Sequence, residues 1–101
     1  MGKTIILDAG HGGNDPGATG NGLKEKDLTL QITNYIFDRL KELGVDVYTT
    51  RTEDITLSPN ERIKKINGFI TPSKDVIVVS NHINAGGVKG SCGKLTFFEN
   101  L

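Results

Sequence analysis

Two continuous apolar segments constrain the fold of this chain more than any other feature of its sequence. Residues 3–9 (KTIILDA) and 75–80 (DVIVVS) are short apolar runs, each ended by a polar stretch, as expected for strands that are buried on both faces of a sheet. Between them lie apolar residues at helical spacing in 26–43, an alternating strand pattern in 45–50, and a second helical segment, 58–68, that opens with a capping box (SPNE). This order predicts an α/β domain with a mixed, mostly parallel sheet flanked by helices.

The size and charge of the chain exclude several classes of function. Its 101 residues form at most one domain, and its twelve basic and twelve acidic side chains give no net charge, which disfavours binding to nucleic acid or to an anionic membrane. Cys92 is the single cysteine, so an internal disulfide or a multi-cysteine metal cluster is impossible. The sequence has no apolar run long enough for membrane insertion and no signal peptide at residues 1–10, so we expect a chain that is made in the cytoplasm.

A dense group of glycines follows the first predicted strand. Six of the thirteen residues from 10 to 22 are glycine, which usually marks turns or a close approach of the backbone to another group. The spacing does not match the two common phosphate-binding motifs. Asp15 takes the position of the third glycine in the dinucleotide fingerprint, and Leu23 takes the position of the P-loop lysine. The glycines therefore favour a different kind of site, although the start of the helix that follows could still attract an anion.

Both histidines of the chain follow predicted strands. His11 comes after residues 3–9 and His82 after residues 75–80, and ligands bind outside the carboxyl ends of the strands in open α/β sheets. Glu25 stands at the start of the first helix, where the flexible glycine loop could bring it back to His11. Two imidazoles and one carboxylate are a known ligand set for catalytic zinc. Taken singly, each histidine fits a hydrogen-bonding role in a loop equally well, and Glu25 fits a carboxylate that interacts with the helix dipole.

Two other groups of residues suggest different chemistry. Cys92 and His82 could form a nucleophile pair, but nothing near the Gly-Ser-Cys-Gly segment suggests an activated thiolate. Arg51 and Arg62 could contact an anionic substrate, although a salt bridge or a place on a helix surface is the commoner outcome for such residues. Neither group is as specific as the predicted metal ligands.

Four segments in the right order resemble a known family. ILDAGHGGNDPGATG, GLKEKDLTL, VYTTRTED and SNHINAGG, spread over about residues 3–87, are similar to the zinc-dependent N-acetylmuramoyl-L-alanine amidases of bacterial autolysins, spore enzymes and phage endolysins. The resemblance implies the fold of these zinc amidases, in which a mixed sheet of the phosphorylase/hydrolase-like type is flanked by helices. It also implies that zinc is the cofactor and that its ligands are His11, Glu25 and His82.

Three further residues are expected to support the ligands or the substrate. Asp8 ends the first predicted strand and is expected to accept a hydrogen bond from His11, because zinc-bound imidazoles usually donate their other N–H to a nearby group. Arg51 and Asn84 lie in the matching motifs and are expected to contact the site or the substrate.

The resemblance implies hydrolysis of the amide bond between the N-acetylmuramoyl group and L-alanine in peptidoglycan. The chain would then act on the cell wall after secretion or release. Residues 88–101 (VKGSCGKLTFFENL) lose the family pattern, although KLTFF could form a strand, and the second glutamate that the family uses as general acid/base has no matching position. Glu99 is the tail carboxylate that could replace it.

We therefore expect residues 1–101 to form the first part of an amidase domain, truncated relative to the family. Two hypotheses remain for what such a domain does. One is an active zinc amidase, completed by a partner or by a second copy of the chain. The alternative is a catalytically impaired, zinc-containing remnant that binds muropeptides without efficient turnover.

Overall fold

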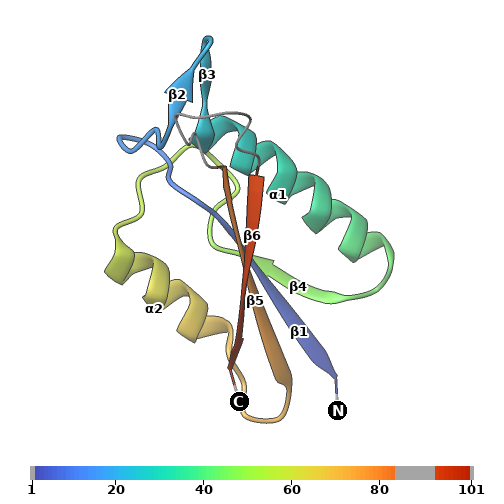
Figure 1. Cartoon of the computed structure of the whole chain (residues 1–101). Helices are drawn as coiled ribbons and strands as arrows, with labels where there is room; N and C mark the ends of the chain where they lie inside the picture. The colour runs from blue at the N-terminus through green and yellow to red at the C-terminus, as the bar shows by residue number, and fades with distance from the viewer. Residues whose placement is uncertain (1, 84–92, 101) are drawn as a thin grey trace.

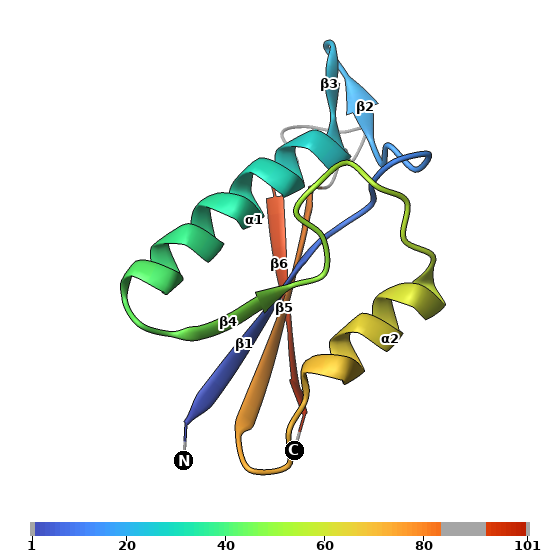
Figure 2. The same ribbon diagram turned by 180° about the vertical axis from the view of Figure 1, so that it is seen from behind.

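The chain folds around a four-stranded sheet with helices packed against it (Figures 1 and 2). The computed structural model describes residues 2–83 and 93–100. In chain order its elements are β1 (Lys3–Ala9), β2 (Thr19–Gly20), β3 (Leu23–Lys24), α1 (Glu25–Glu42), β4 (Asp46–Thr49), α2 (Pro59–Phe69), β5 (Asp75–Ile83) and β6 (Gly93–Asn100). Among the described residues, no helix combines the length and the apolarity that crossing a membrane requires.

The strand order of the sheet is β4-β1-β5-β6. β1 pairs in parallel with both β4 and β5, and Ile6 of β1 lies opposite Val78 of β5. β6 pairs with β5 in the antiparallel direction. The predicted mixed, mostly parallel sheet is thus confirmed. β1 and β5 are its two central strands, which is why their sequences read as continuous apolar runs.

The two helices cover opposite faces of this sheet. On one face, a small buried core of β1 and β5 side chains packs against the second helix and its C-terminal residue: Ile6, Val76 and Val78 with Ile66, Phe69 and Ile70. Successive side chains of a strand alternate between faces, so Asn81 of β5 points to the face opposite the one that holds Val76 and Val78. The Asn81 side chain donates to the carbonyl of Thr29 in α1, which places α1 on the other face.

The buried stripe of α1 differs from the apolar stripe in the sequence. Its side chains nearest the sheet include Thr29 and Thr33, which are buried, whereas Ile32 and Tyr35 are 41% and 72% exposed. The Thr29 hydroxyl donates to the Gly10 carbonyl at 2.8 Å, so a small polar side chain joins the helix to the residue that follows the carboxyl end of β1. The predicted helix is confirmed, but threonines occupy much of its inner face, and the apolar side chains of Ile32 and Tyr35 lie to one side of that face.

Both helices have the ends that the sequence predicts. α1 ends at Glu42 with Leu43 as its C-cap, and Gly44 follows with φ 79° while its N–H donates to the Lys41 carbonyl. α2 begins with a complete capping box. The Ser58 side chain accepts from the Glu61 N–H at 3.1 Å, and the Glu61 carboxylate accepts from the Ser58 N–H at 2.8 Å.

Two features near the carboxyl ends of the parallel strands were not predicted. β5 extends to Ile83, so His82 lies within the strand and does not follow it, because pairing with β6 continues beyond the point where β1 ends. Residues 19–24 form a small hairpin, β2-β3, whose two turn residues, Asn21 and Gly22, both have positive φ. This is the turn type that an Asn-Gly pair favours. The hairpin projects from the sheet end where α1 begins (Figure 1).

Candidate metal centre

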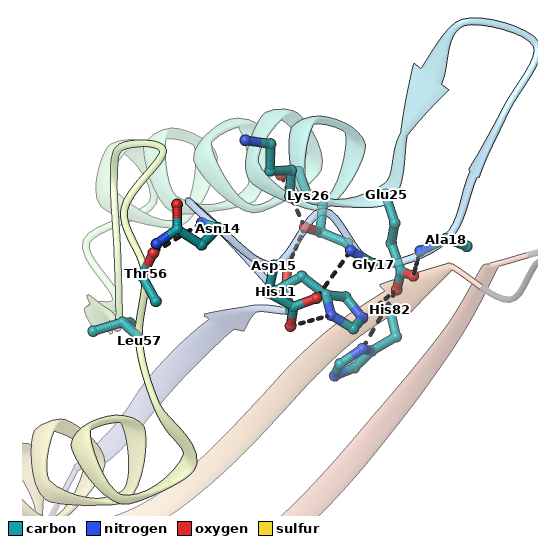
Figure 3. A network of polar contacts seen from close by, with 12 residues as sticks. His11, Asn14, Asp15, Gly17, Ala18, Glu25, Lys26, Thr56, Leu57 and His82 are labelled. Carbon is teal, nitrogen blue, oxygen red and sulfur yellow. Dashed lines mark hydrogen bonds and ion pairs between the residues drawn. The ribbon is translucent and has the colours of Figure 1, made fainter.

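Three side chains from distant parts of the chain meet at the carboxyl ends of the parallel strands (Figure 3). His11 follows β1, Glu25 is the first residue of α1, and His82 lies near the end of β5. One potential ligand atom of each residue lies within 4.8 Å of those of the other two. The structure therefore brings together the three residues that the sequence analysis named as metal ligands.

A single carboxylate oxygen of Glu25 faces both imidazoles. Oε2 lies 3.1 Å from Nε2 of His11 and 3.5 Å from Nδ1 of His82. The two rings meet edge to face with their centroids 5.1 Å apart. The Glu25 side chain is only 5% exposed, whereas those of His11 and His82 are 25% and 39% exposed. The cluster is thus closed on the side of the carboxylate and open to solvent on the side of the imidazoles.

Glu25 is held in place as an ionised carboxylate. Its Oε1 accepts a hydrogen bond from the Ala18 N–H at 3.0 Å, and its Oε2 accepts one from the Ile83 N–H at 2.8 Å. Burial acts to raise the pKa of Glu25, but these hydrogen bonds and the nearby histidines outweigh it and leave the pKa below its ordinary value. The position of Glu25 in the first turn of α1 adds a favourable interaction with the helix dipole.

His11 has an uncommon backbone conformation. Its φ is 63°, in the left-handed region that costs a residue with a side chain about 1–2 kcal/mol. Nδ1 of its ring lies 2.8 Å from Oδ2 of Asp15, and its carbonyl accepts a hydrogen bond from Arg62 at 3.2 Å. Contacts to both the ring and the backbone therefore hold His11 in the orientation that faces Glu25.

Two of the glycines leave the space that the ligand side chains occupy. A Cβ on Gly10 would lie 2.5 Å from Cε1 of His82. A Cβ on Gly17, whose φ is 69°, would lie 2.7 Å from both Oε1 of Glu25 and Cδ2 of His11. These distances are too short for any side chain to be added without displacing a ligand. The dense glycine segment is explained in part by this close packing of backbone against the cluster.

Asp8 does not contact His11 as the sequence analysis expected. Alternation along β1 directs its carboxylate to the face of the sheet that α2 covers, where it accepts hydrogen bonds from Thr50 at 2.8 Å and Ser80 at 2.7 Å and pairs with Arg62. The position beside the His11 ring is taken by Asp15. That role of Asp15 was not predicted, although the Asp-Pro-Gly turn four residues after His11 is a usable signal for it.

Arg51 and Arg62 bind the backbone of the loop that carries His11. Arg51 is 2% exposed and donates to the carbonyls of Ala9 at 3.2 Å and Gly10 at 2.9 Å, among others. Arg62 donates to the carbonyls of Ala9 at 2.9 Å and His11 at 3.2 Å. Where the sequence suggested contact with a substrate, the structure shows two guanidinium groups that organise the strand end and the loop.

The remaining candidate residues of the sequence analysis come after His82 in the chain. Asn84 and Cys92 lie outside the described residues. In the ladder of β5 and β6, Glu99 lies opposite Ile77, five residues along β5 from His82. At about 3.3 Å per residue, this separation is roughly 17 Å. The strand register therefore places the backbone of Glu99 far from the metal ligands.

Sequence comparisons relate this chain to cell-wall amidases. The family model Amidase_3, described as N-acetylmuramoyl-L-alanine amidase, matches residues 5–100, which includes much of the segment after residue 87. Uncharacterized protein YqiI of Bacillus subtilis is 41% identical over 98 residues, which make up 97% of this chain and 45% of YqiI. The sporulation-specific N-acetylmuramoyl-L-alanine amidase of the same bacterium is 43% identical over 88 residues, or 85% of this chain and 33% of that protein.

Solved structures share the fold. The catalytic domain of CwlV, an N-acetylmuramoyl-L-alanine amidase from Bacillus (Paenibacillus) polymyxa, matches with a TM-score of 0.74 and 31% identity over 85% of this chain and 48% of that domain. An N-acetylmuramoyl-L-alanine amidase from Clostridium difficile matches with a TM-score of 0.74 and 34% identity over 88% of this chain and 48% of that one. The chain thus spans about half of these structures and less than half of the curated relatives. Because the family model matches nearly all of its length, the chain belongs to the Amidase_3 family of N-acetylmuramoyl-L-alanine amidases.

Proposed function

We propose that this chain binds one zinc ion through His11, Glu25 and His82 and hydrolyses the amide bond between the N-acetylmuramoyl group and L-alanine in peptidoglycan. The observation that carries the proposal is the meeting of two imidazoles and one ionised carboxylate within 4.8 Å. This donor set fits zinc, whose catalytic sites use three such protein ligands and keep a fourth position open. Membership of the amidase family supports the choice of reaction.

The geometry of the cluster suits a hydrolytic metal site. Zinc, when bound, supplies a Lewis acid that polarises the scissile carbonyl and brings the pKa of a water molecule toward neutrality. Glu25 contributes a buried negative charge that two backbone N–H groups keep in place. The partly exposed imidazoles of His11 and His82 leave the solvent side open, where a large glycan strand can approach.

Proton transfer to the leaving amine needs a further group. We propose that the general acid/base comes from outside the described residues; the pairing of Glu99 with Ile77, five residues or roughly 17 Å along β5 from His82, supports this. A positioned general acid or base typically contributes about 10² to 10⁴ in rate. We therefore propose slow, metal-dependent hydrolysis by this chain alone, which should rise by about that factor when a family-like C-terminal segment with its glutamate is appended.

A partner is one further way to complete the site. The structure of the CwlD amidase from Clostridioides difficile contains the GerS lipoprotein in complex with that enzyme. We propose that the present chain acts on the cell wall outside the cytoplasm, where its substrate lies, and that another chain or a second copy can supply the general acid/base. Mixing the chain with an inactive relative that retains the family's second glutamate should then raise activity.

The test measures metal and product separately. Zinc content is determined after dialysis, and new N-terminal alanine is measured after incubation with purified peptidoglycan. We expect one zinc per chain in the wild type and none in the Glu25→Gln/His82→Ala double variant, with Asp38→Asn, on the exposed surface of α1, as the control. An unchanged metal content in the double variant would show that these residues are not the ligands. Bound zinc without release of alanine, even after a family-like C-terminal segment is appended, would favour the alternative of a muropeptide-binding module.

A further inference from the structure

We infer that Asp15 is a positioning residue for His11: its carboxylate holds the imidazole in the tautomer that carries its proton on Nδ1 and leaves Nε2 free to bind the metal. The inference rests on the proposed metal site and adds to it a residue outside the ligand set. Asp15 Oδ2 lies 2.8 Å from Nδ1 of His11, on the side of the ring that faces away from Glu25 (Figure 3).

The His11 ring lies between two carboxylates that compete for its proton. Nδ1 faces Asp15 at 2.8 Å, and Nε2 faces Glu25 at 3.1 Å. A neutral imidazole carries one N–H, and an ionised carboxylate can only accept, so a hydrogen bond to one carboxylate leaves a lone pair directed at the other. With the proton on Nδ1, the lone pair of Nε2 is directed toward Glu25 and His82, where a metal would bind.

Asp15 is placed for this task by the loop itself. Residues 12 and 15 exchange two backbone hydrogen bonds, at 2.8 Å from the Gly12 N–H and at 3.0 Å from the Asp15 N–H, which closes a tight turn. The second carboxylate oxygen, Oδ1, accepts a hydrogen bond from the Gly17 N–H at 3.1 Å. With Oδ1 held in this way, Oδ2 is directed at His11, so the carboxylate does not need to be ordered when the metal binds.

The exposure of Asp15 separates this role from a contribution to the folded core. Its side chain is 62% exposed, so replacement by an amide of the same size creates no cavity and leaves no buried charge without a partner. Asp8, the carboxylate first expected to contact His11, is 7% exposed and holds Arg62, so its replacement would disturb the fold as well as the site. Substitution of Asp15 is therefore a cleaner test of orientation than substitution of Asp8.

The experiment compares Asp15→Asn with Asp15→Glu and with the control Asp38→Asn. Nitrogen NMR of His11 in the chelated chain, at a pH at which the ring is neutral, identifies which ring nitrogen is protonated, and competition with a chromophoric chelator measures zinc affinity. We expect the wild type to carry its proton on Nδ1. Because an amide can either accept from or donate to Nδ1, Asp15→Asn should give a mixture of tautomers, with zinc affinity reduced about 10- to 100-fold. Asp15→Glu keeps a carboxylate and should recover part of the affinity, and Asp38→Asn should match the wild type.

The outcomes distinguish this inference from the proposed function. If the wild type binds zinc and Asp15→Asn retains both the affinity and a single Nδ1–H tautomer, the role of Asp15 is refuted and the metal site stands. If the wild type binds no zinc, the proposed function fails, and a role for Asp15 toward the metal fails with it. A wild-type His11 protonated on Nε2 refutes the inference whether or not any variant folds.

Discussion

Replacement of Gly17 by alanine tests whether this glycine preserves the space of the candidate metal centre. A Cβ at this position would lie 2.7 Å from both Oε1 of Glu25 and Cδ2 of His11. The left-handed backbone at φ 69° costs alanine about 1–2 kcal/mol. Displacement of the crowded neighbours adds about 1–3 kcal/mol, the usual cost of overpacking. Together these give a loss of roughly 2–5 kcal/mol, a large share of the approximately 5–15 kcal/mol that stabilises a domain.

Gly22→Ala is the matched control for this experiment. Gly22 has a similar φ of 76°, but nothing lies within 4 Å of its Cβ position, so alanine there incurs only the backbone cost. Urea unfolding in the presence of chelator measures the stability of both variants, and chelator competition measures their zinc affinity. We expect Gly17→Ala to be about 1–3 kcal/mol less stable than Gly22→Ala and to be the one that loses zinc affinity. Equal stability and equal zinc affinity of the two variants would refute the packing argument.

Three further predictions concern the metal, a buried carboxylate and the tail. Chelation of the zinc-loaded chain should lower its melting temperature, because free zinc at a thousandfold excess over Kd stabilises the folded state by about 4 kcal/mol; superimposable melting curves would contradict this. Asp8→Asn should cost about 3–5 kcal/mol at neutral pH, because it leaves Arg62 without its buried partner. Burial acts to raise the pKa of Asp8, but hydrogen bonds from Arg62, Ser80 and Thr50 outweigh it and hold the pKa below 3.8. Urea unfolding of the wild type should therefore show a loss of stability as the pH falls below that value, because the carboxylate becomes protonated. The Asp8→Asn variant should not show this loss. Glu99→Gln should leave zinc affinity unchanged, and a loss of binding by dialysis would show that the tail reaches the site.

The elements of the fold were predictable because their signals are local. The apolar runs of β1 and β5, the capping box at Ser58 and the glycine after α1 each specify a strand or a helix boundary within a few residues of sequence. The Asn21-Gly22 pair is an equally local signal for the hairpin, which was nevertheless not predicted. The end of β5 was different, because its last residues are held by pairing with β6 and not by their own sequence.

The three candidate ligands were predictable for a different reason. Parallel strands deliver the residues at their carboxyl ends to one edge of the sheet, so the placement of His11 and His82 followed from the topology alone. The order of elements also placed Glu25 at the start of α1. Topology does not determine which side chain contacts which ligand. The prediction that Asp8 accepts a hydrogen bond from His11 was wrong. Alternation along β1 turns Asp8 to the face of the sheet opposite the one that α1 covers.

The contacts that orient the candidate ligands depend on a buried polar network that hydrophobic patterns do not reveal. Glycines aside, six apolar residues and nine polar or charged ones are buried among residues 2–83. No described buried side-chain nitrogen or oxygen lacks a hydrogen-bond partner. Arg51 donates to four backbone carbonyls around the site and to the Thr29 hydroxyl, and no periodicity of the sequence distinguishes it from an arginine that binds substrate. Because the apolar core of this domain is small, the polar network contributes much of the interaction that holds the loop in place. An unpaired buried donor is costly, so the position of each group in the network restricts the positions of its partners. The precision of the cluster therefore comes from arginines and carboxylates outside it, whose partners are set only when the strands and loops assemble.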